Sequence, residues 1–294
     1  MKQHTSIAVV AALLVAGWLA MARAFGMFLP SSARIDGKDR PSSAFARSKR
    51  FVDIDGRKVA YVEAGDGEPL TGLMKHLQIE RAKFVAYDHG GAVALLMMDR
   101  HADKIERLVL TNIEAYDQWP SQPELKYLKM IVNPVTSPIV FTALKSDWVR
   151  HRIFRIAVHD ERTLNPHILA EWVTPHTASG KRWQRLRRFF RWQPDREHNS
   201  VTQSGVPSMR RFDKATLLVW GEQDTNFGPV LAKRLARDIP GATGNVWMKN
   251  SAHMPMVEEP QAYADTVLAF MKDAEMPHSQ LLDRKMLDPA PPHR

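Results

Sequence analysis

The chain contains no cysteine. This absence excludes disulfide bonds, a cysteine nucleophile and metal sites built from thiolates, although it does not fix the compartment in which the protein works. Apolar residues are not scarce, at 44% of 294 residues. A chain of this length and composition can form one α/β domain with an inserted lid.

Acidic residues are in the minority, 32 against 41 lysines and arginines, which gives a formal charge of +9 at pH 7. The basic residues crowd residues 34–58 and 181–191. Such an excess favours contact with an anionic surface, either lipid or nucleic acid. No nucleic-acid-binding motif accompanies the charge, so we expect no nucleic acid among the partners. Residues 181–192 predict a basic amphipathic helix, for which two interpretations are open: a helix lying on a membrane surface, or a lid helix with a solvated cationic side.

The N-terminal segment has the composition of a targeting sequence. Residues 7–22 are apolar and uncharged, and Lys2 precedes them. This pattern is typical of a signal peptide or a short membrane anchor, here residues 1–30, followed by a linker over residues 31–50. Ala22-Arg23-Ala24 is a poor cleavage site, and the basic residues after it favour a cytoplasmic body. The sequence therefore predicts a membrane-anchored or exported, periplasmic protein and leaves the side of the membrane open.

The body of the chain alternates predicted strands with predicted helices, which indicates an α/β fold with a mostly parallel sheet. Residues 51–116 and 213–274 form the two parts of this core. Between them, residues 117–212 show no strand alternation and predict a helical lid, and residues 275–294 predict a disordered tail. The expected elements are a hairpin over 51–64, a helix over 71–79, a strand over 82–88, a helix over 90–101, strands over 107–112, 215–221 and 245–249, and a helix over 260–272.

The stretch over residues 83–94 is the most informative part of the chain. An apolar run rich in β-forming residues ends at Asp88, glycines follow at once, and a helix-forming stretch comes next. Strand, tight turn and helix in this order form a nucleophile elbow, with one reactive side chain on the turn. Ala86 and Gly90 suit such a turn because larger side chains would clash there. Aspartate at the apex, where serine is absent, indicates attack by a carboxylate on an alkyl carbon.

Two further polar residues follow later strands. Asp224 comes after the strand over 215–221, and His253 comes after the strand over 245–249. Parallel strands end at one edge of a sheet, so we expect both residues to lie near Asp88. Nucleophile, acid and histidine also follow one another in the chain order of an α/β-hydrolase. Glu114, which follows a preceding strand, is the rival candidate for the acid.

In these motifs the chain resembles α/β-hydrolases of the haloalkane dehalogenase and epoxide hydrolase branch. The matching segments lie within residues 51–272 and are Phe84–Gly91, Leu108–Asn112, Tyr116–Pro120, Leu218–Asp224 and Ser251–Pro255. The resemblance implies that Asp88 forms an ester intermediate, that His253 activates water and that Asp224 orients His253. It also implies that the backbone N–H of His89 holds the oxyanion. No metal and no organic cofactor is implied, and the partners are a small apolar substrate and water.

The resemblance leaves two reactions open. Tryptophans in or near the lid, Trp119 among them, suit the binding of a leaving halide. Epoxide hydrolases instead use paired lid tyrosines, and here the lid offers Tyr127, with Tyr116 just before it. This balance favours a haloalkane dehalogenase over an epoxide hydrolase. His89 stands where dehalogenases often carry a tryptophan, and we expect it to contribute only its backbone. The remaining tryptophans of this group are Trp148, Trp172, Trp183 and Trp192, most of which we expect to be packing residues.

One piece of the family pattern is missing after residues 67–70. Relatives continue with a buried strand, a His-Gly turn, a helix and another strand, whereas Leu70 is followed directly by Thr71. The missing turn normally supplies the second oxyanion N–H. We therefore expect either that the strand over 82–88 has an open edge or that the hairpin over 51–64 shifts in to cover it. We also expect a slower reaction, since the loss of one oxyanion donor lowers the rate roughly 10²–10³-fold. A membrane-tethered homologue with impaired catalysis is thus a second hypothesis, whereas an esterase is disfavoured because no serine occupies the apex.

Overall fold

The computed structural model describes residues 49–54, 57–62, 71–192 and 202–272. The chain divides into two compact units, residues 1–51 with 60–62 and residues 52–59 with 63–294. Strands β1 (Lys49–Ile54) and β2 (Arg57–Val62) form a two-stranded sheet, which confirms the two strands of the predicted hairpin. The predicted signal peptide or anchor, most of the linker and the C-terminal tail lie outside the described residues.

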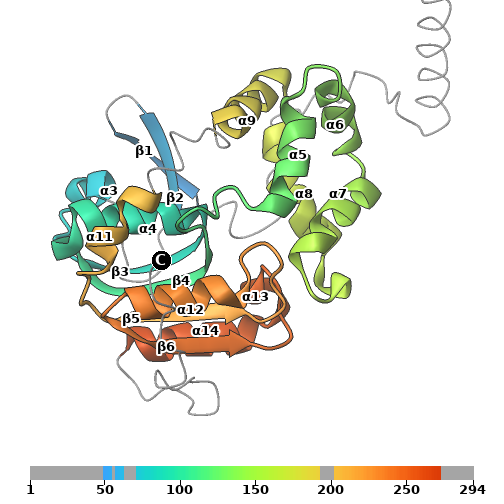
Figure 1. Ribbon diagram of the computed structural model, residues 1–294. Helices are drawn as coiled ribbons and strands as arrows, with labels where there is room; N and C mark the ends of the chain where they lie inside the picture. Colours follow the sequence, from blue (N-terminus) through green and yellow to red (C-terminus); the bar gives the residue numbers. More distant parts are fainter. Residues whose placement is uncertain (1–48, 55–56, 63–70, 193–201, 273–294) are drawn as a thin grey trace, which may run out of the picture. The chain divides into compact units, whose positions relative to one another are not determined.

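The second unit is built on a four-stranded sheet with the order β3-β4-β5-β6 (Figure 1). Its strands are β3 (Ala82–Asp88), β4 (Ile105–Ile113), β5 (Thr216–Gly221) and β6 (Ala242–Met248). Each neighbouring pair is parallel. All six residues of β5 are buried, as parallel strands are when helices cover both faces of their sheet. The predicted architecture, a parallel sheet flanked by helices, is confirmed.

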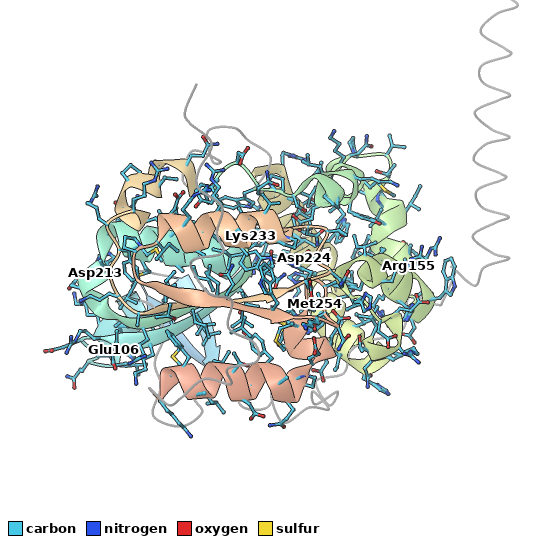
Figure 2. All side chains as sticks on the ribbon, turned by 60° about the horizontal axis from the view of Figure 1, so that its bottom comes forward. Glu106, Arg155, Asp213, Asp224, Lys233 and Met254 are labelled. Carbon is cyan, nitrogen blue, oxygen red and sulfur yellow. The ribbon has the colours of Figure 1, made fainter. Side chains whose placement is uncertain are left out.

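Successive residues of β4 enter two separate apolar clusters, one on each face of the sheet. Leu108 and Leu110 pack on one face with α4 (His89–Arg100) and α12 (Pro229–Asp238). Val109 packs on the other face against α14 (Pro260–Met271). Figure 2 shows α12 and α14 on opposite sides of the sheet. Each fully buried leucine or valine contributes about 1.5–3 kcal/mol, so burial on both faces holds these strands and fixes their ends.

Between β4 and β5 the described residues form helices and loops, as the predicted lid requires, and none of them is in a strand. The helices are α5 (Gln122–Val132), α6 (Ser137–Ala143), α7 (Asp147–Phe154), α8 (Pro166–Thr177), α9 (Gly180–Trp192) and α11 (Val206–Met209). They have an apolar cluster of their own, in which Trp183 packs with Leu144 and Val173. The predicted basic helix is thus present as α9, with Trp183 on its buried side.

β3 is the terminal strand of the four-stranded sheet and pairs there with β4 alone among the strands that the structure describes. Val85 of β3 is 51% exposed and Val93 of α4 is 41% exposed. A hollow of about 420 Å³ lies along this side of β3 and α4. This edge is where the sequence analysis puts the missing segment, whose loss stays a prediction.

Candidate active site

The nucleophile elbow has the strained backbone that its role requires. β3 ends at Asp88, which has φ 51° and ψ −122°, and α4 begins at His89. A positive φ at a residue other than glycine costs roughly 1–3 kcal/mol and persists only where the surroundings enforce it. The start of α4 packs tightly against β4 at Gly91, where an added Cβ would stand 2.2 Å from the Cβ of Ile113. At Gly90 the atom nearest to an added Cβ would be 3.9 Å away. The expectation that a larger side chain would clash at Gly90 was therefore wrong, because the clash is at Gly91.

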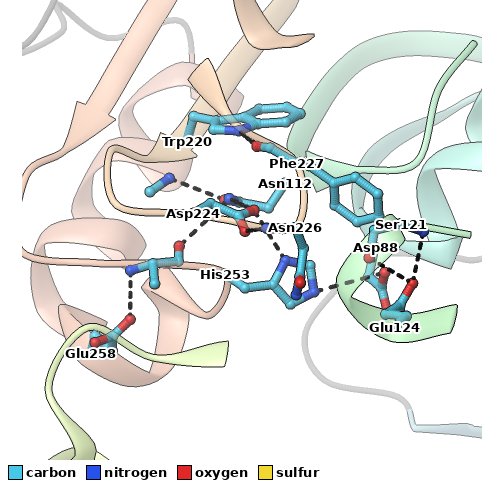
Figure 3. A network of polar contacts seen from close by, with 12 residues as sticks. Asp88, Asn112, Ser121, Glu124, Trp220, Asp224, Asn226, Phe227, His253 and Glu258 are labelled. Carbon is cyan, nitrogen blue, oxygen red and sulfur yellow. Dashed lines mark hydrogen bonds and ion pairs between the residues drawn. The ribbon is translucent and has the colours of Figure 1, made fainter. Parts of the chain in front are cut away.

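The structure brings Asp88, Asp224 and His253 together at the carboxyl end of the sheet (Figure 3). His253 Nδ1 lies 3.2 Å from Asp224 Oδ2, and its Nε2 lies 3.8 Å from Asp88 Oδ1. Asp224 and His253 are buried, while the side chain of Asp88 is 26% exposed. One imidazole thus bridges a buried carboxylate and a carboxylate that a substrate can reach.

The electrostatics of His253 follow from these two carboxylates. Burial alone lowers the pKa of His253, but the hydrogen bond and charge of Asp224, together with the charge of Asp88, outweigh burial and raise the pKa above its ordinary value. The charge of Asp88 is therefore one of the causes that favour the protonated ring. Neutralising Asp88 removes one of the charges that stabilise the protonated ring, which moves its pKa downward.

Asn112, which the sequence analysis did not single out as a functional residue, holds Asp224 in place. Its Nδ2 donates to Asp224 Oδ2 at 2.6 Å, and its Oδ1 accepts from the backbone N–H of Gly221 at 3.1 Å. The backbone N–H of Asn226 donates to the other Asp224 oxygen at 2.7 Å. A buried polar residue at the end of an otherwise apolar strand was the available signal.

The loop that carries His253 is fixed by two glutamates. Glu258 Oε2 accepts from the backbone N–H of Ala252 at 2.7 Å, while its Oε1 accepts from the backbone N–H groups of His159 and Asp160 at 2.6 and 2.9 Å. Glu259 accepts from the hydroxyl of Ser251 at 2.6 Å. Charge-assisted bonds of this kind are stronger than neutral ones. Glu258 therefore ties the His253 loop to the region before α8.

His89 does more than lend its backbone, which corrects the sequence expectation. Its Nδ1 lies 2.8 Å from Glu114 Oε2 and 3.7 Å from Asp88 Oδ1. The sequence analysis considered Glu114 as the acid for His253, but Asp224 is the carboxylate that His253 contacts. Glu114, fully buried, instead faces His89. Two imidazole–carboxylate pairs therefore lie beside Asp88.

Trp119 is the tryptophan that lies near the elbow. It is buried, and its ring centroid is 6.4 Å from that of His89. Trp148 is 73% exposed, and the indole N–H of Trp183 donates to Ser137 Oγ at 2.9 Å. The indole N–H of Trp183 is thus already used in a hydrogen bond, as expected of a packing residue, and the binding of a leaving halide by Trp119 stays a prediction.

Asp88, His89 and Glu114 also offer donor atoms within 4.8 Å of one another, close enough to surround one cation. His89 Nδ1 and Glu114 Oε2 are, however, already in direct contact at 2.8 Å, an ion-pair distance when the ring is protonated. We therefore treat the cluster as an imidazole–carboxylate pair beside Asp88 and assign no metal to it.

Comparison with known proteins identifies the family. The family model described as the alpha/beta hydrolase fold matches residues 61–260. The chain therefore belongs to the α/β-hydrolase family, and it is a hydrolase in the general sense of that family.

The relatives share the fold at low identity. The uncharacterized hydrolase YugF of Bacillus subtilis (strain 168) is 22% identical over 203 residues, which cover 69% of this chain and 70% of that protein. A putative ancestral haloalkane dehalogenase, AncHLD2, matches with a TM-score of 0.57 and 18% identity over 69% of this chain and 71% of its own. The serine hydrolase CCSP0084 from Cycloclasticus zankles, a bacterium that degrades polyaromatic hydrocarbons, matches with a TM-score of 0.55 and 16% identity over 68% and 67% of the two chains. At these identities, structural likeness shows the fold alone.

No helix among the described residues is long and apolar enough to cross a membrane. The predicted anchor or signal peptide lies outside those residues, so the expected export or anchoring stays a prediction.

Proposed function

We propose that the protein hydrolyses a small apolar alkyl electrophile, an alkyl halide or an epoxide, through an ester formed on Asp88. The observation that carries the proposal is the chain of contacts from Asp88 through His253 to Asp224, with 3.8 and 3.2 Å between the ionisable groups. Backbone N–H groups and the dipole at the first turn of a helix stabilise an anion formed or held there. Asp88 lies at such a turn, on a strained backbone, and its side chain is 26% exposed.

The second half of the reaction needs a neutral His253, and ester formation favours that state. While Asp88 is an anion, its charge helps to keep His253 protonated. The ester is neutral, so the pKa of His253 falls and the ring becomes able to take a proton from water. Hydroxide then attacks the ester carbonyl, and Asp224 stabilises the imidazolium that forms. Water is the second substrate, and neither a metal nor an organic cofactor takes part in these steps.

A catalytically impaired homologue is the second candidate. It is supported by the terminal position of β3 in the described sheet and by the absence of a second His-Gly turn in the sequence. If one oxyanion donor is lacking, hydrolysis of the ester is slower by roughly 10²–10³. The first half of the reaction does not use that donor, so an ester on Asp88 would still form in such a protein.

The two candidates are separated by trapping the ester. A His253→Ala variant cannot activate water, so incubation with 1-bromohexane or 1,2-epoxyhexane should leave a covalent adduct on the peptide that contains Asp88, detected by mass spectrometry. An Asp88→Ala, His253→Ala double variant is the matched control and should carry none. An adduct together with turnover by the unaltered protein supports the hydrolase, and an adduct without turnover supports the impaired homologue. Absence of an adduct with both compounds contradicts an Asp88 nucleophile.

A further inference from the structure

A second imidazole, that of His89, lies beside Asp88 in addition to that of His253. His89 Nδ1 is 3.7 Å from Asp88 Oδ1, and His253 Nε2 is 3.8 Å from the same oxygen. Each ring is backed by a buried carboxylate, Glu114 for His89 and Asp224 for His253. One base for water requires one such pair, so the His89 pair has no task in the mechanism given above.

The register of the sheet builds this second pair. From Lys83 to Tyr87 the strands β3 and β4 keep one register, and an irregularity between Tyr87 and Asp88 then places Asp88 opposite Ile113. Glu114 therefore follows directly beside the start of α4, and its backbone N–H donates to the Asp88 carbonyl at 3.4 Å. Among the described residues, His89 is the one cationic group within 4 Å of the Glu114 carboxylate. Burying that carboxylate costs several kcal/mol unless an opposite charge compensates it, so the structure holds the two side chains as a unit.

The surroundings of His89 favour its charged form. Burial alone lowers the pKa of His89, but the contact with Glu114 and the charges of Asp88, Glu114 and Glu124 raise it to about 9. Burial likewise raises the pKa of Glu114 to about 7, against the opposing effect of His89. Each member of the pair therefore favours the charged form of the other. From α9 the ring of Phe189 packs edge-on at 5.5 Å, while Arg185 and Arg188 of that helix are exposed to solvent.

We propose that His89, held by Glu114, is the acid that protonates a substrate oxygen as Asp88 attacks, which makes epoxides the substrate class of this site. The inference rests on the proposed ester on Asp88. The side chains of His89 and Asp88 are 35% and 26% exposed, and the two atoms that face each other, His89 Nδ1 and Asp88 Oδ1, are buried. A small ligand would therefore meet the other ring nitrogen and the other carboxylate oxygen. A halide leaves as a stable anion and needs no proton. An epoxide oxygen leaves as a strongly basic alkoxide, for which a positioned acid contributes typically 10²–10⁴ in rate.

The steps balance without a further reactant. Asp88 Oδ bonds to an epoxide carbon, the C–O bond breaks, and the electron pair goes to the oxygen, which takes one proton from the His89 imidazolium. His253 then removes a proton from water, and the hydroxide adds to the ester carbonyl. Collapse of the tetrahedral intermediate expels the diol oxygen, which takes the proton from His253. The regenerated Asp88 carboxylic acid returns its proton to His89.

Of the two tyrosines that the sequence analysis considered for this acid role, Tyr116, which lies just before the lid, is engaged elsewhere. Tyr116 is buried, and its hydroxyl donates to Asp238 at 2.9 Å. The guanidinium of Arg234 covers its ring at 3.6 Å from the centroid. The hydroxyl of Tyr116 is therefore committed to Asp238, and His89 is the histidine beside Asp88 that faces Glu114 and not Asp224.

The test measures the rate of adduct formation on Asp88 in the His253→Ala background with two compounds of equal chain length, 1,2-epoxyhexane and 1-bromohexane. His89→Asn should slow the epoxide reaction by about 100-fold or more and the bromide reaction by less than about tenfold. The bromide reaction reports that the fold and the nucleophile are intact. His101→Asn, the same change at the other end of α4, is the matched control and should alter neither rate.

The pH profile separates a proton donor from a packing residue. With His89 present, the epoxide reaction should slow as pH rises through about 9. Glu114→Gln removes the opposing charge and should move that decline to lower pH, while the bromide reaction shows no such shift. The proposal is overturned by equal losses with both compounds in His89→Asn, by no loss with either, or by a protein that reacts with the bromide but never with the epoxide. Failure of both compounds with His89 intact overturns the Asp88 ester itself.

Discussion

Replacing Asn112 tests whether one buried amide holds the acid of the site in place. Asn112→Ala leaves the N–H of Gly221 without its acceptor and takes one of the donors from Asp224 Oδ2. Each buried group left unsatisfied costs about 1–3 kcal/mol, and Asp224 keeps two other donors, so we expect about 2–4 kcal/mol from the lost hydrogen bonds. Asn112 has φ 42°, a left-handed conformation that alanine adopts at an added cost of about 1 kcal/mol.

The total expected loss for Asn112→Ala is therefore about 3–5 kcal/mol in the free energy of unfolding, measured by urea denaturation. Asn112→Gly removes the amide without the conformational cost and should lose about 2–4 kcal/mol. Asn245→Ala is the control, because Asn245 is equally buried in β6 and its Oδ1 has no hydrogen-bond partner among the described residues. A loss below about 1 kcal/mol in Asn112→Ala, or the same loss in the control, would refute the reasoning.

Two further substitutions probe the elbow and the acid. Gly91→Ala would place a Cβ 2.2 Å from that of Ile113, so we expect a loss of at least about 1–3 kcal/mol in thermal or urea denaturation. Gly90→Ala, with no atom nearer than 3.9 Å, should change stability by less than about 1 kcal/mol, and equal effects at the two sites would contradict the packing argument. Asp224→Asn removes the charge that raises the pKa of His253. The pKa should fall in an NMR titration and turnover should drop by about 10⁴, whereas an unchanged titration would show that Asp224 does not act on the ring.

The sequence analysis succeeded where the signal is local. The strand over 82–88 has the bounds of β3, because an apolar run stops at a carboxylate followed by glycines. The positions of Asp224 and His253 at strand ends also follow from local patterns and from the common direction of parallel strands. α12 was missed, although Pro229 at its start and its spaced apolar residues are typical helix signals.

The parts that could not be predicted depend on register and on side-chain direction. The contact between His89 and Glu114 arises from the irregularity after Tyr87, and no motif in the sequence marks that irregularity. Whether Glu114 or Asp224 serves His253 likewise depends on which carboxylate lies nearer in space. The steric requirement at Gly91 comes from a side chain on a neighbouring strand. Each of these is a tertiary contact between segments whose separation in sequence gives no guide to their distance.

The central claim is that Asp88 attacks the substrate and that water attacks Asp88. A single turnover in H₂¹⁸O, with the protein in excess over 1,2-epoxyhexane or 1-bromohexane, distinguishes this route from direct attack by water. Water should add to the carbonyl carbon of the ester, so the account predicts ¹⁸O in the peptide that contains Asp88 and an unlabelled alcohol or diol. A labelled product with an unlabelled Asp88 peptide would contradict it.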